Sequence, residues 1–284
     1  MKESHTRLLK QFGNMAADGQ FGGSIKKAQQ EYGHLSSLTI LHKFVLDFWG
    51  GILKKNDEFS QMRSLSCQLL LVAYREAKKR NPEIAQSLVN SFTTDYPGVP
   101  ESTLLPRWCS LAQASIAMRE VAQSENRLMI WQQACKQFQA YNEFLNGLFA
   151  YLIILWRVKD GRSVKTNVFD ATYANKIDQF GALTGGDDGA FYLFFRLARP
   201  KIRNAIAHET IWLDSVENKI RYEEGRHPRS EYEMDLTEFM GLAAAGSHLA
   251  QPYLAAISVI AIIEEDYELG KKELPPPLTR LLEY

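Results

Sequence analysis

Apolar residues recur at steps of three and four along most of the chain, the spacing that places them on one face of a helix. The clearest early stripe runs from Glu58 to Arg80, after which Asn81-Pro82 interrupts the pattern. We therefore expect a mostly helical protein. The same spacing predicts helices over residues 24–32, 36–54, 104–123, 125–159, 170–183, 189–208 and 236–267, with a further short helix ending at Phe92.

Two short segments depart from this helical pattern. Thr210 to Asp214 and Lys219 to Glu223 alternate polar and apolar residues, and the intervening SVEN is suited to a turn. This arrangement predicts a small surface β-hairpin. The residues EEGRHPRS at its far end are expected to form a polar loop. Asp170 is expected to cap the helix over residues 170–183.

Breaks in the helical pattern also divide the chain. The segment TTDYPGVPESTLLP holds three prolines and one glycine, which cannot sustain a helix, so it is expected to be a connector. We place an N-terminal helical region of unknown role at residues 1–100 and a second helical region at 101–284. The last helical stretch is expected to be interrupted at Gly241, Gly246 and Pro252. A length of 284 residues agrees with two units.

The composition excludes several classes of function. The 33 basic residues balance 33 acidic ones, so the chain is not a basic nucleic-acid wrapper, although a local basic patch remains open. The three cysteines lack the spacing of metal sites or disulfide frameworks. No signal peptide is expected at the N-terminus, and the longest apolar runs are too short to span a bilayer. We expect a cytoplasmic protein with no metal, no cofactor and no membrane partner.

The segment from Phe191 to His208 carries the candidate chemistry. A helical wheel places its large apolar residues on one face, as a core stripe. Arg203 and Asn204 project roughly opposite this stripe, with His208 at the edge of the outward arc. Guanidinium and imidazole groups together suit a phosphodiester, because the first donates to phosphate oxygens and the second moves protons near neutral pH. From the residues alone, an ordinary histidine at a helix end remains the alternative.

The sequence Arg203-Asn204-Ala205-Ile206-Ala207-His208 resembles the Arg-x4-6-His motif of the HEPN superfamily, the helical domains of many toxin, abortive-infection and CRISPR-associated ribonucleases. The resemblance covers residues 125–267, where the order of expected helices is similar to the antiparallel four-helix bundle of that family. It implies an all-α, HEPN-like bundle in which the β-hairpin and the N-terminal helices are additions. It also implies a metal-independent endoribonuclease that acts as a homodimer on RNA.

Carried over to this chain, the resemblance assigns catalytic positions to Arg203 and His208 and the polar position after the arginine to Asn204. The implied reaction is attack of an RNA 2'-hydroxyl on the adjacent phosphate, leaving a 2',3'-cyclic phosphate. Such an enzyme would be a toxin or antiphage effector, with an antitoxin or sensor protein as a further partner. Arg203 and His208 lie about 140° apart on an ideal helix, so a second subunit is expected to complete the site.

Three further side chains are weaker candidates for the same site. Arg196 and Arg199 form a basic ridge with Arg203 on an unbroken helix and are expected to bind substrate. The family motif is often accompanied by an acidic residue, for which Asp178 is the first candidate and Glu143 its competitor. For each of them, an ordinary solvated carboxylate on a helix surface remains the alternative. The alternative function, from another class, is a non-catalytic HEPN-like module that dimerises and binds a nucleotide or a protein.

Overall fold

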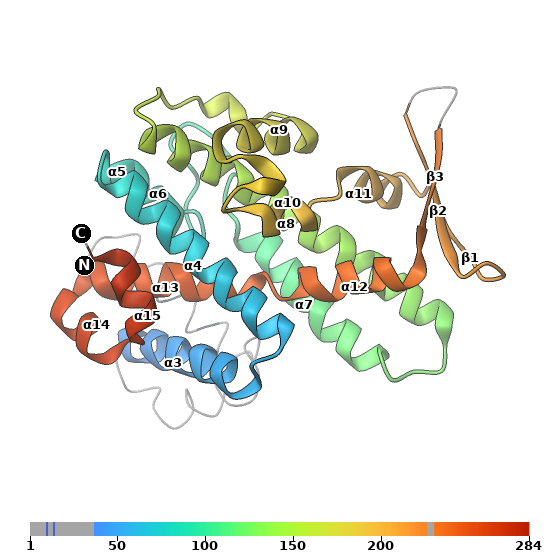
Figure 1. Ribbon diagram of the computed structural model, residues 1–284, viewed down its shortest axis with the longest axis horizontal. Helices are drawn as coiled ribbons and strands as arrows, with labels where there is room; N and C mark the ends of the chain where they lie inside the picture. Colours follow the sequence, from blue (N-terminus) through green and yellow to red (C-terminus); the bar gives the residue numbers. More distant parts are fainter. Residues whose placement is uncertain (1–9, 11–13, 15–36, 226–229, 284) are drawn as a thin grey trace. The chain divides into compact units, whose positions relative to one another are not determined.

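The computed structural model describes residues 10, 14, 37–225 and 230–283, and this part of the chain is mostly helical (Figure 1). The helix expected over residues 24–32 lies outside these ranges. The described residues form two compact units, and the chain enters the second one next to the proline-rich connector. Residues 101–284 are nevertheless not one unit, because the chain returns to unit 1 twice. Unit 1 draws on Met1–Leu105, Ala150–Asp170 and Ala250–Tyr284, and unit 2 consists of Pro106–Phe149 and Ala171–Leu249.

Unit 1 is helical and is built around α13 (Ala250–Glu265). This helix packs against α3 (Ser37–Lys55), α4 (Glu58–Lys78) and α14 (Tyr267–Glu273). Every residue of α13 from Pro252 to Ile263 is buried, as expected for a helix that is apolar on all sides. Asp57 accepts a hydrogen bond from the Ser60 backbone and so begins α4. The other elements of this unit are α5 (Pro82–Ala85), α6 (Ser87–Asn90), the second part of α8 (Arg127–Lys159), η1 (Thr166–Val168), α15 (Pro276–Thr279) and η3 (Arg280–Leu282).

One described segment, Leu236–Glu265, is long and apolar enough to cross a membrane, but 83% of its most apolar window is buried inside the protein. Burial of this kind is typical of the core helices of soluble proteins. The structure breaks the segment at residues 248 and 249, between α12 (Leu236–Ser247) and α13. Gly241 and Gly246 therefore lie inside a helix instead of interrupting one. Pro252 lies in the first turn of α13, where its missing N–H is tolerated.

Unit 2 has a helical core rich in aromatic side chains. Phe180 stacks on Phe195 with ring centroids 5.5 Å apart, and Phe138 stacks on Phe239 at 4.8 Å. The elements of this unit are α7 (Leu105–Val121), the first part of α8 (Arg127–Lys159), α9 (Tyr173–Thr184), η2 (Gly186–Asp188), α10 (Tyr192–Leu197), α11 (Pro200–Ala207), α12 and three strands. Thr172, and not Asp170 as expected, caps α9 by accepting from the Asn175 backbone.

The motif segment is two helices and not the single helix expected over residues 189–208. α10 ends at Leu197, and α11 begins at Pro200. Proline is suited to the first position of a helix but not to its interior, where its ring clashes with the preceding turn. The expected core stripe is confirmed, since both helices bury their apolar residues. The buried members of the stripe are Phe191, Phe194, Phe195, Ala198, Ile202 and Ala205.

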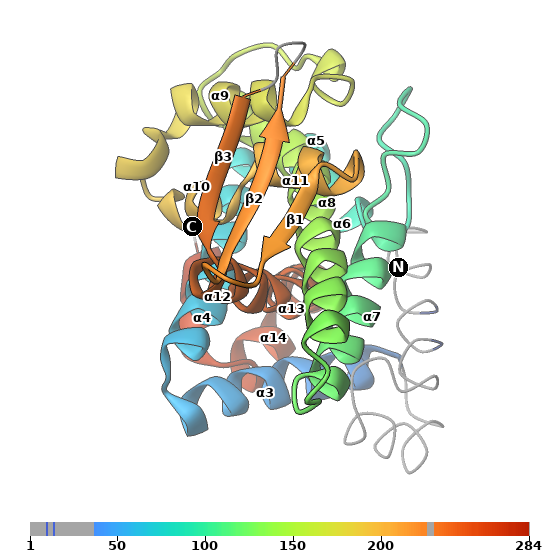
Figure 2. The same ribbon diagram turned by 90° about the vertical axis from the view of Figure 1, so that its right-hand side faces the viewer.

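The expected hairpin is part of a three-stranded antiparallel sheet in the order β1-β2-β3 (Figure 2). β1 (Ile211–Asp214) and β2 (Lys219–Glu224) occupy the two predicted segments, whereas β3 (Ser230–Asp235) was not predicted. β3 is an edge strand with a largely exposed, acidic sequence, which gives a weak apolar alternation. Tyr232 of β3 nevertheless stacks on Tyr222 of β2, with ring centroids 5.4 Å apart. α11 packs against β1 and β2.

Two glycines of α12 provide a matched test of the packing in unit 2. A Cβ at Gly246 would lie 2.2 Å from the buried ring of Tyr141, whereas a Cβ at Gly241 would meet nothing within 4 Å. We expect Gly246→Ala to lower the free energy of unfolding by about 2 kcal/mol, because the ring has no room to move. Gly241→Ala should raise it by about 0.5–1 kcal/mol through helix propensity. Urea denaturation of both variants checks this, and equal effects would contradict the packing described.

Candidate functional site

The start of α11 is held by a buried asparagine of α8. Asn142 is fully buried, and its Oδ1 accepts one hydrogen bond from the backbone N–H of Arg199 at 2.9 Å and another from the Tyr173 hydroxyl at 3.0 Å. Its Nδ2 donates to the Phe138 carbonyl at 3.0 Å. Burial raises the pKa of Tyr173 well above its usual value, so this hydroxyl remains a neutral donor. Asn142 therefore connects α8, α9 and the residue that precedes α11.

The next residue of α8 binds the guanidinium of the motif. Glu143 Oε1 accepts from Arg203 Nε at 2.6 Å and also contacts Nη2 of the same side chain. Arg203 Nη1 donates to the Asn204 side-chain oxygen at 2.9 Å. The Arg203 and Glu143 side chains remain 26% and 30% exposed, so the ion pair lies at the surface and is reachable from solvent. The structure thus brings Glu143, and not Asp178, to the arginine.

The histidine of the motif lies at the other end of α11. His208 is the C-terminal cap residue and is exposed. After it the chain turns through Glu209, whose φ of 56° is left-handed, and the Thr210 N–H returns to the Ala205 carbonyl at 2.8 Å. A turn of this kind satisfies the last carbonyls of a helix and is usually made by glycine. The turn leads directly into β1, so the sheet holds the end of the helix that carries His208.

His208 borders a hollow of about 270 Å³ between the end of α11 and the end of β2. Arg203 is not part of this lining, whereas Asn204 both lines the hollow and accepts from Arg203. The Lys201 ammonium lies 3.6 Å from the Glu224 carboxylate and offsets one of the two acidic groups there. The two motif residues thus border different spaces within one chain. The hollow is lined by Asn204, Ala205, His208, Thr210, Glu223, Glu224 and Gly225.

The expected basic ridge is not formed, because the break before Pro200 separates its members. Arg196 is exposed and lies over the Tyr192 ring, 5.1 Å from its centroid. Arg199 Nη1 donates to the carbonyls of Phe195 and Ala198 at the end of α10. Each arginine therefore has a different environment.

Asp178 is an exposed residue of α9. Sequence reasoning missed Asn142, although one signal was present: consecutive polar residues interrupt the apolar run of a long helix in YNEFLNGLFA. A polar pair in such a run indicates buried hydrogen bonds or a functional site.

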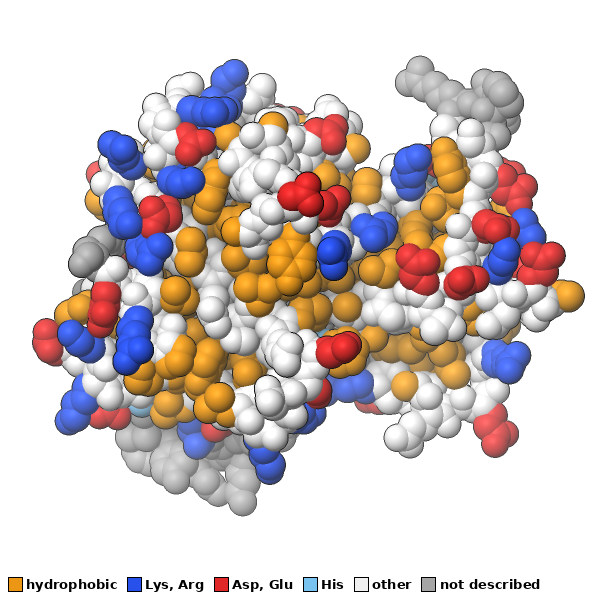
Figure 3. All heavy atoms as spheres, in the orientation of Figure 1, with side chains coloured by type: hydrophobic (Ala, Val, Ile, Leu, Met, Phe, Trp, Pro, Cys, Tyr) orange, Lys and Arg blue, Asp and Glu red, His pale blue; other side chains and the backbone are white. Residues whose placement is uncertain are grey.

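The surface charge is mixed. Figure 3 shows basic and acidic side chains interspersed over the surface in view, in agreement with the zero net charge of the chain. Within residues 37–225 and 230–283, no three His, Cys, Asp or Glu side chains gather closely enough to hold a metal ion.

Comparisons of this chain with protein-family models, with curated proteins and with solved structures find no match. The functional argument accordingly rests on the residues of the site and their geometry.

The role of Asn142 predicts a graded loss of stability. Asn142→Leu preserves volume but leaves the Arg199 N–H and the Tyr173 hydroxyl unpaired in the interior, so the free energy of unfolding should fall by about 3 kcal/mol. Tyr173→Phe removes only one of these hydrogen bonds and should cost about 1 kcal/mol. Chemical denaturation measures both. The proposed anchoring of α11 is wrong if the two variants are equally stable.

Proposed function

We propose that this protein is a metal-independent endoribonuclease whose active site is formed by α11, with Arg203 and His208 as catalytic residues and Asn204 as their polar companion. The observation that carries the proposal is the orientation and the exposure of the Arg203 and His208 side chains. The guanidinium is oriented by Glu143 while a quarter of its side chain stays exposed, and the imidazole is exposed beside a hollow. Neither group is sealed inside the fold, so a polynucleotide has access to both.

The proposed chemistry uses the 2'-hydroxyl of RNA as the nucleophile. Its oxygen attacks the adjacent phosphorus, the bond from phosphorus to O5' breaks, and the products are a 2',3'-cyclic phosphate and a 5'-hydroxyl. His208 accepts the proton of the 2'-hydroxyl or supplies the proton that O5' takes up. Arg203 stabilises the additional negative charge on the phosphorane oxygens. DNA lacks the nucleophile and should not be cleaved.

Glu143 orients Arg203 without using all of its donors. A guanidinium has five N–H groups. Within the described residues, two of its nitrogens bind Glu143 and the third donates once to Asn204, so three N–H groups are engaged. The remaining two are available for phosphate oxygens. A guanidinium held in one orientation loses less entropy on binding than a mobile one, which favours recognition of a phosphate by two parallel hydrogen bonds.

A homodimer would complete the site. Arg203 lies against α8, whereas His208 borders the hollow at the sheet, so the two groups of one chain face different directions. A two-fold axis near α11 would place the arginine of one protomer opposite the histidine of its partner, because a symmetric interface joins each surface to its own copy. In this arrangement each scissile phosphate contacts both subunits.

The biological role that fits this chemistry is that of an RNA-cutting toxin or antiphage effector acting in the cytoplasm, held inactive by an antitoxin or a sensor protein. A non-catalytic, HEPN-like binding module is the second candidate. The observation that favours it is the ion pair itself, since Glu143 already compensates the charge of Arg203. A compensated arginine attracts a phosphate less strongly than one whose charge is not offset.

Cleavage of RNA in excess EDTA tests the catalytic proposal. Wild-type protein should produce cyclic-phosphate ends. His208→Ala should lower the rate by a factor of about 100 or more, because a general acid-base group is lost. Arg203→Ala should have a similar effect through loss of charge stabilisation. Gel analysis of labelled RNA, with 2'-O-methyl RNA as the uncleavable comparison, measures both rates.

Matched controls for this experiment are His42→Ala and Arg162→Ala, which alter the same residue types on α3 and in the turn after α8. Both should cleave at the wild-type rate. Cleavage that survives the loss of either motif residue, or that persists on 2'-O-methyl RNA, is inconsistent with the mechanism. Binding of RNA without cleavage by the wild type would favour the non-catalytic module.

Subunit complementation tests the dimer. Arg203→Ala and His208→Ala chains are each expected to be inactive, but their one-to-one coexpression should restore about a quarter of wild-type activity, since half of the dimers are mixed and each retains one intact site. The readout is RNA cleavage by the purified mixture, together with its mass in solution. A mixture as inactive as either parent would show that both groups act from one chain.

A further inference from the structure

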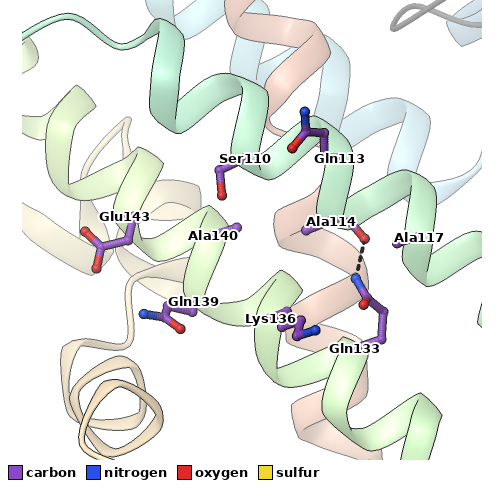
Figure 4. A pocket seen from close by; sticks show the side chains of 9 residues that line it. All are labelled: Ser110, Gln113, Ala114, Ala117, Gln133, Lys136, Gln139, Ala140 and Glu143. Atoms are coloured by element: carbon purple, nitrogen blue, oxygen red, sulfur yellow. Dashed lines mark hydrogen bonds between the residues drawn. The ribbon is translucent and has the colours of Figure 1, made fainter.

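A second hollow lies beside the same ion pair, between α7 and α8 of unit 2, and has a volume of about 470 Å³ (Figure 4). This volume lies within the range of sites that hold nucleotide-sized ligands. We call it the α7–α8 groove. Its lining residues on α7 are Ser110, Gln113, Ala114 and Ala117, and those on α8 are Gln133, Lys136, Gln139, Ala140 and Glu143.

The groove is open because small side chains form part of its walls. It is polar because glutamine amides border it. Figure 4 shows Gln133 reaching across from α8 to α7, where its Nε2 donates to the Ala114 carbonyl at 3.0 Å. This bridge holds the two helices together across the groove. Gln113 is exposed and Gln139 is half-buried, so both amides face a space that solvent reaches. A neutral amide offers a donor and an acceptor side by side, the pattern that matches the edge of a nucleobase.

The charges along the groove suit a polyanion. Lys136 is exposed and supplies a positive charge, while the single carboxylate of the lining, Glu143, is already paired with Arg203. Lys136 and Glu143 are seven residues apart on one face of α8, which places them about 10 Å apart along the helix axis. One end of the groove therefore lies at the Arg203–Glu143 ion pair, and the positively charged Lys136 side chain lies about two helical turns away from that end.

We infer that the α7–α8 groove binds the segment of single-stranded RNA next to the phosphate that Arg203 contacts, with Lys136 at a flanking phosphate and the Gln113 and Gln139 amides at a base edge. This inference rests on the proposed function, because the Arg203–Glu143 pair marks the end of the groove that would lie next to the scissile phosphate. The strand must be single, since the base edges of a duplex are already paired. Specificity for the sequence around the cut would then come from α7 and α8, which lie outside the motif helix.

Binding of a fluorescent 2'-O-methyl RNA decamer in EDTA tests the groove independently of catalysis, because this probe has no nucleophile. Lys136→Ala should weaken binding about tenfold at low salt. It should also reduce the slope of log Kd against log salt by about 0.7, the value for one phosphate contact on a single strand. Lys43→Ala, an exposed lysine of α3, is the matched control and should change neither quantity.

A second pair of variants tests the space itself without changing charge. Ala117→Trp would fill the groove and should weaken binding tenfold or more, whereas Gln132→Trp, at an exposed position of α8 outside the lining, should not. Circular dichroism of each variant confirms that it is folded. Gln139→Ala should alter the base preference around the cut, which sequencing of the cleavage products measures.

The outcomes separate this inference from the proposed function. Weaker binding by Lys136→Ala and Ala117→Trp supports the groove even if the wild type cleaves nothing, in which case only the catalytic proposal fails. If the wild type cleaves RNA and the Lys136→Ala and Ala117→Trp variants bind and cleave it at the wild-type level, the proposed groove is wrong. The proposed active site is then unaffected. Failure of the wild type to bind the decamer also overturns the groove.

Discussion

The candidate site depends on two consecutive residues of α8. Asn142 fixes the backbone at the start of α11 from inside the fold, and Glu143 orients the Arg203 guanidinium at the surface. This dependence has a physical reason, because α11 has only eight residues and a helix so short has little stability of its own. Its position is set by contacts with α8 at one end and with the sheet at the other. The chemistry of the motif therefore derives its geometry from residues outside the motif.

The balance of positive and negative charge is the second constraint on this protein. The chain has no net charge, and the arginine of the motif has a carboxylate partner. Under the proposed function, long-range attraction of RNA would be weak, and recognition would come from short-range hydrogen bonds at places where groups converge. A second subunit and the α7–α8 groove are two ways to supply such contacts. Both would make the proposed activity conditional on assembly or on the RNA strand, which would suit the toxic enzyme that we propose.

The fold follows from the structure, whereas the functional proposal follows from the motif and its side chains. The fold is mostly helical with a three-stranded antiparallel sheet. The resemblance to HEPN ribonucleases rests on one short motif and the order of helices around it. Since folds host many functions, the motif has weight only through the state of its side chains: one oriented guanidinium and one exposed imidazole on a single short helix.

Local pattern determined much of this protein. Apolar spacing was sufficient to predict most helices, the buried face of the motif segment and the exposed position of His208, because each depends on neighbours within two or three turns. The tertiary structure alone selected Glu143 over Asp178, recruited Asn142 and added β3 to the sheet. These choices depend on which surfaces meet when helices pack, and the Arg203–Glu143 pair joins residues 60 positions apart. Periodicity along one segment contains no information about contacts at that range.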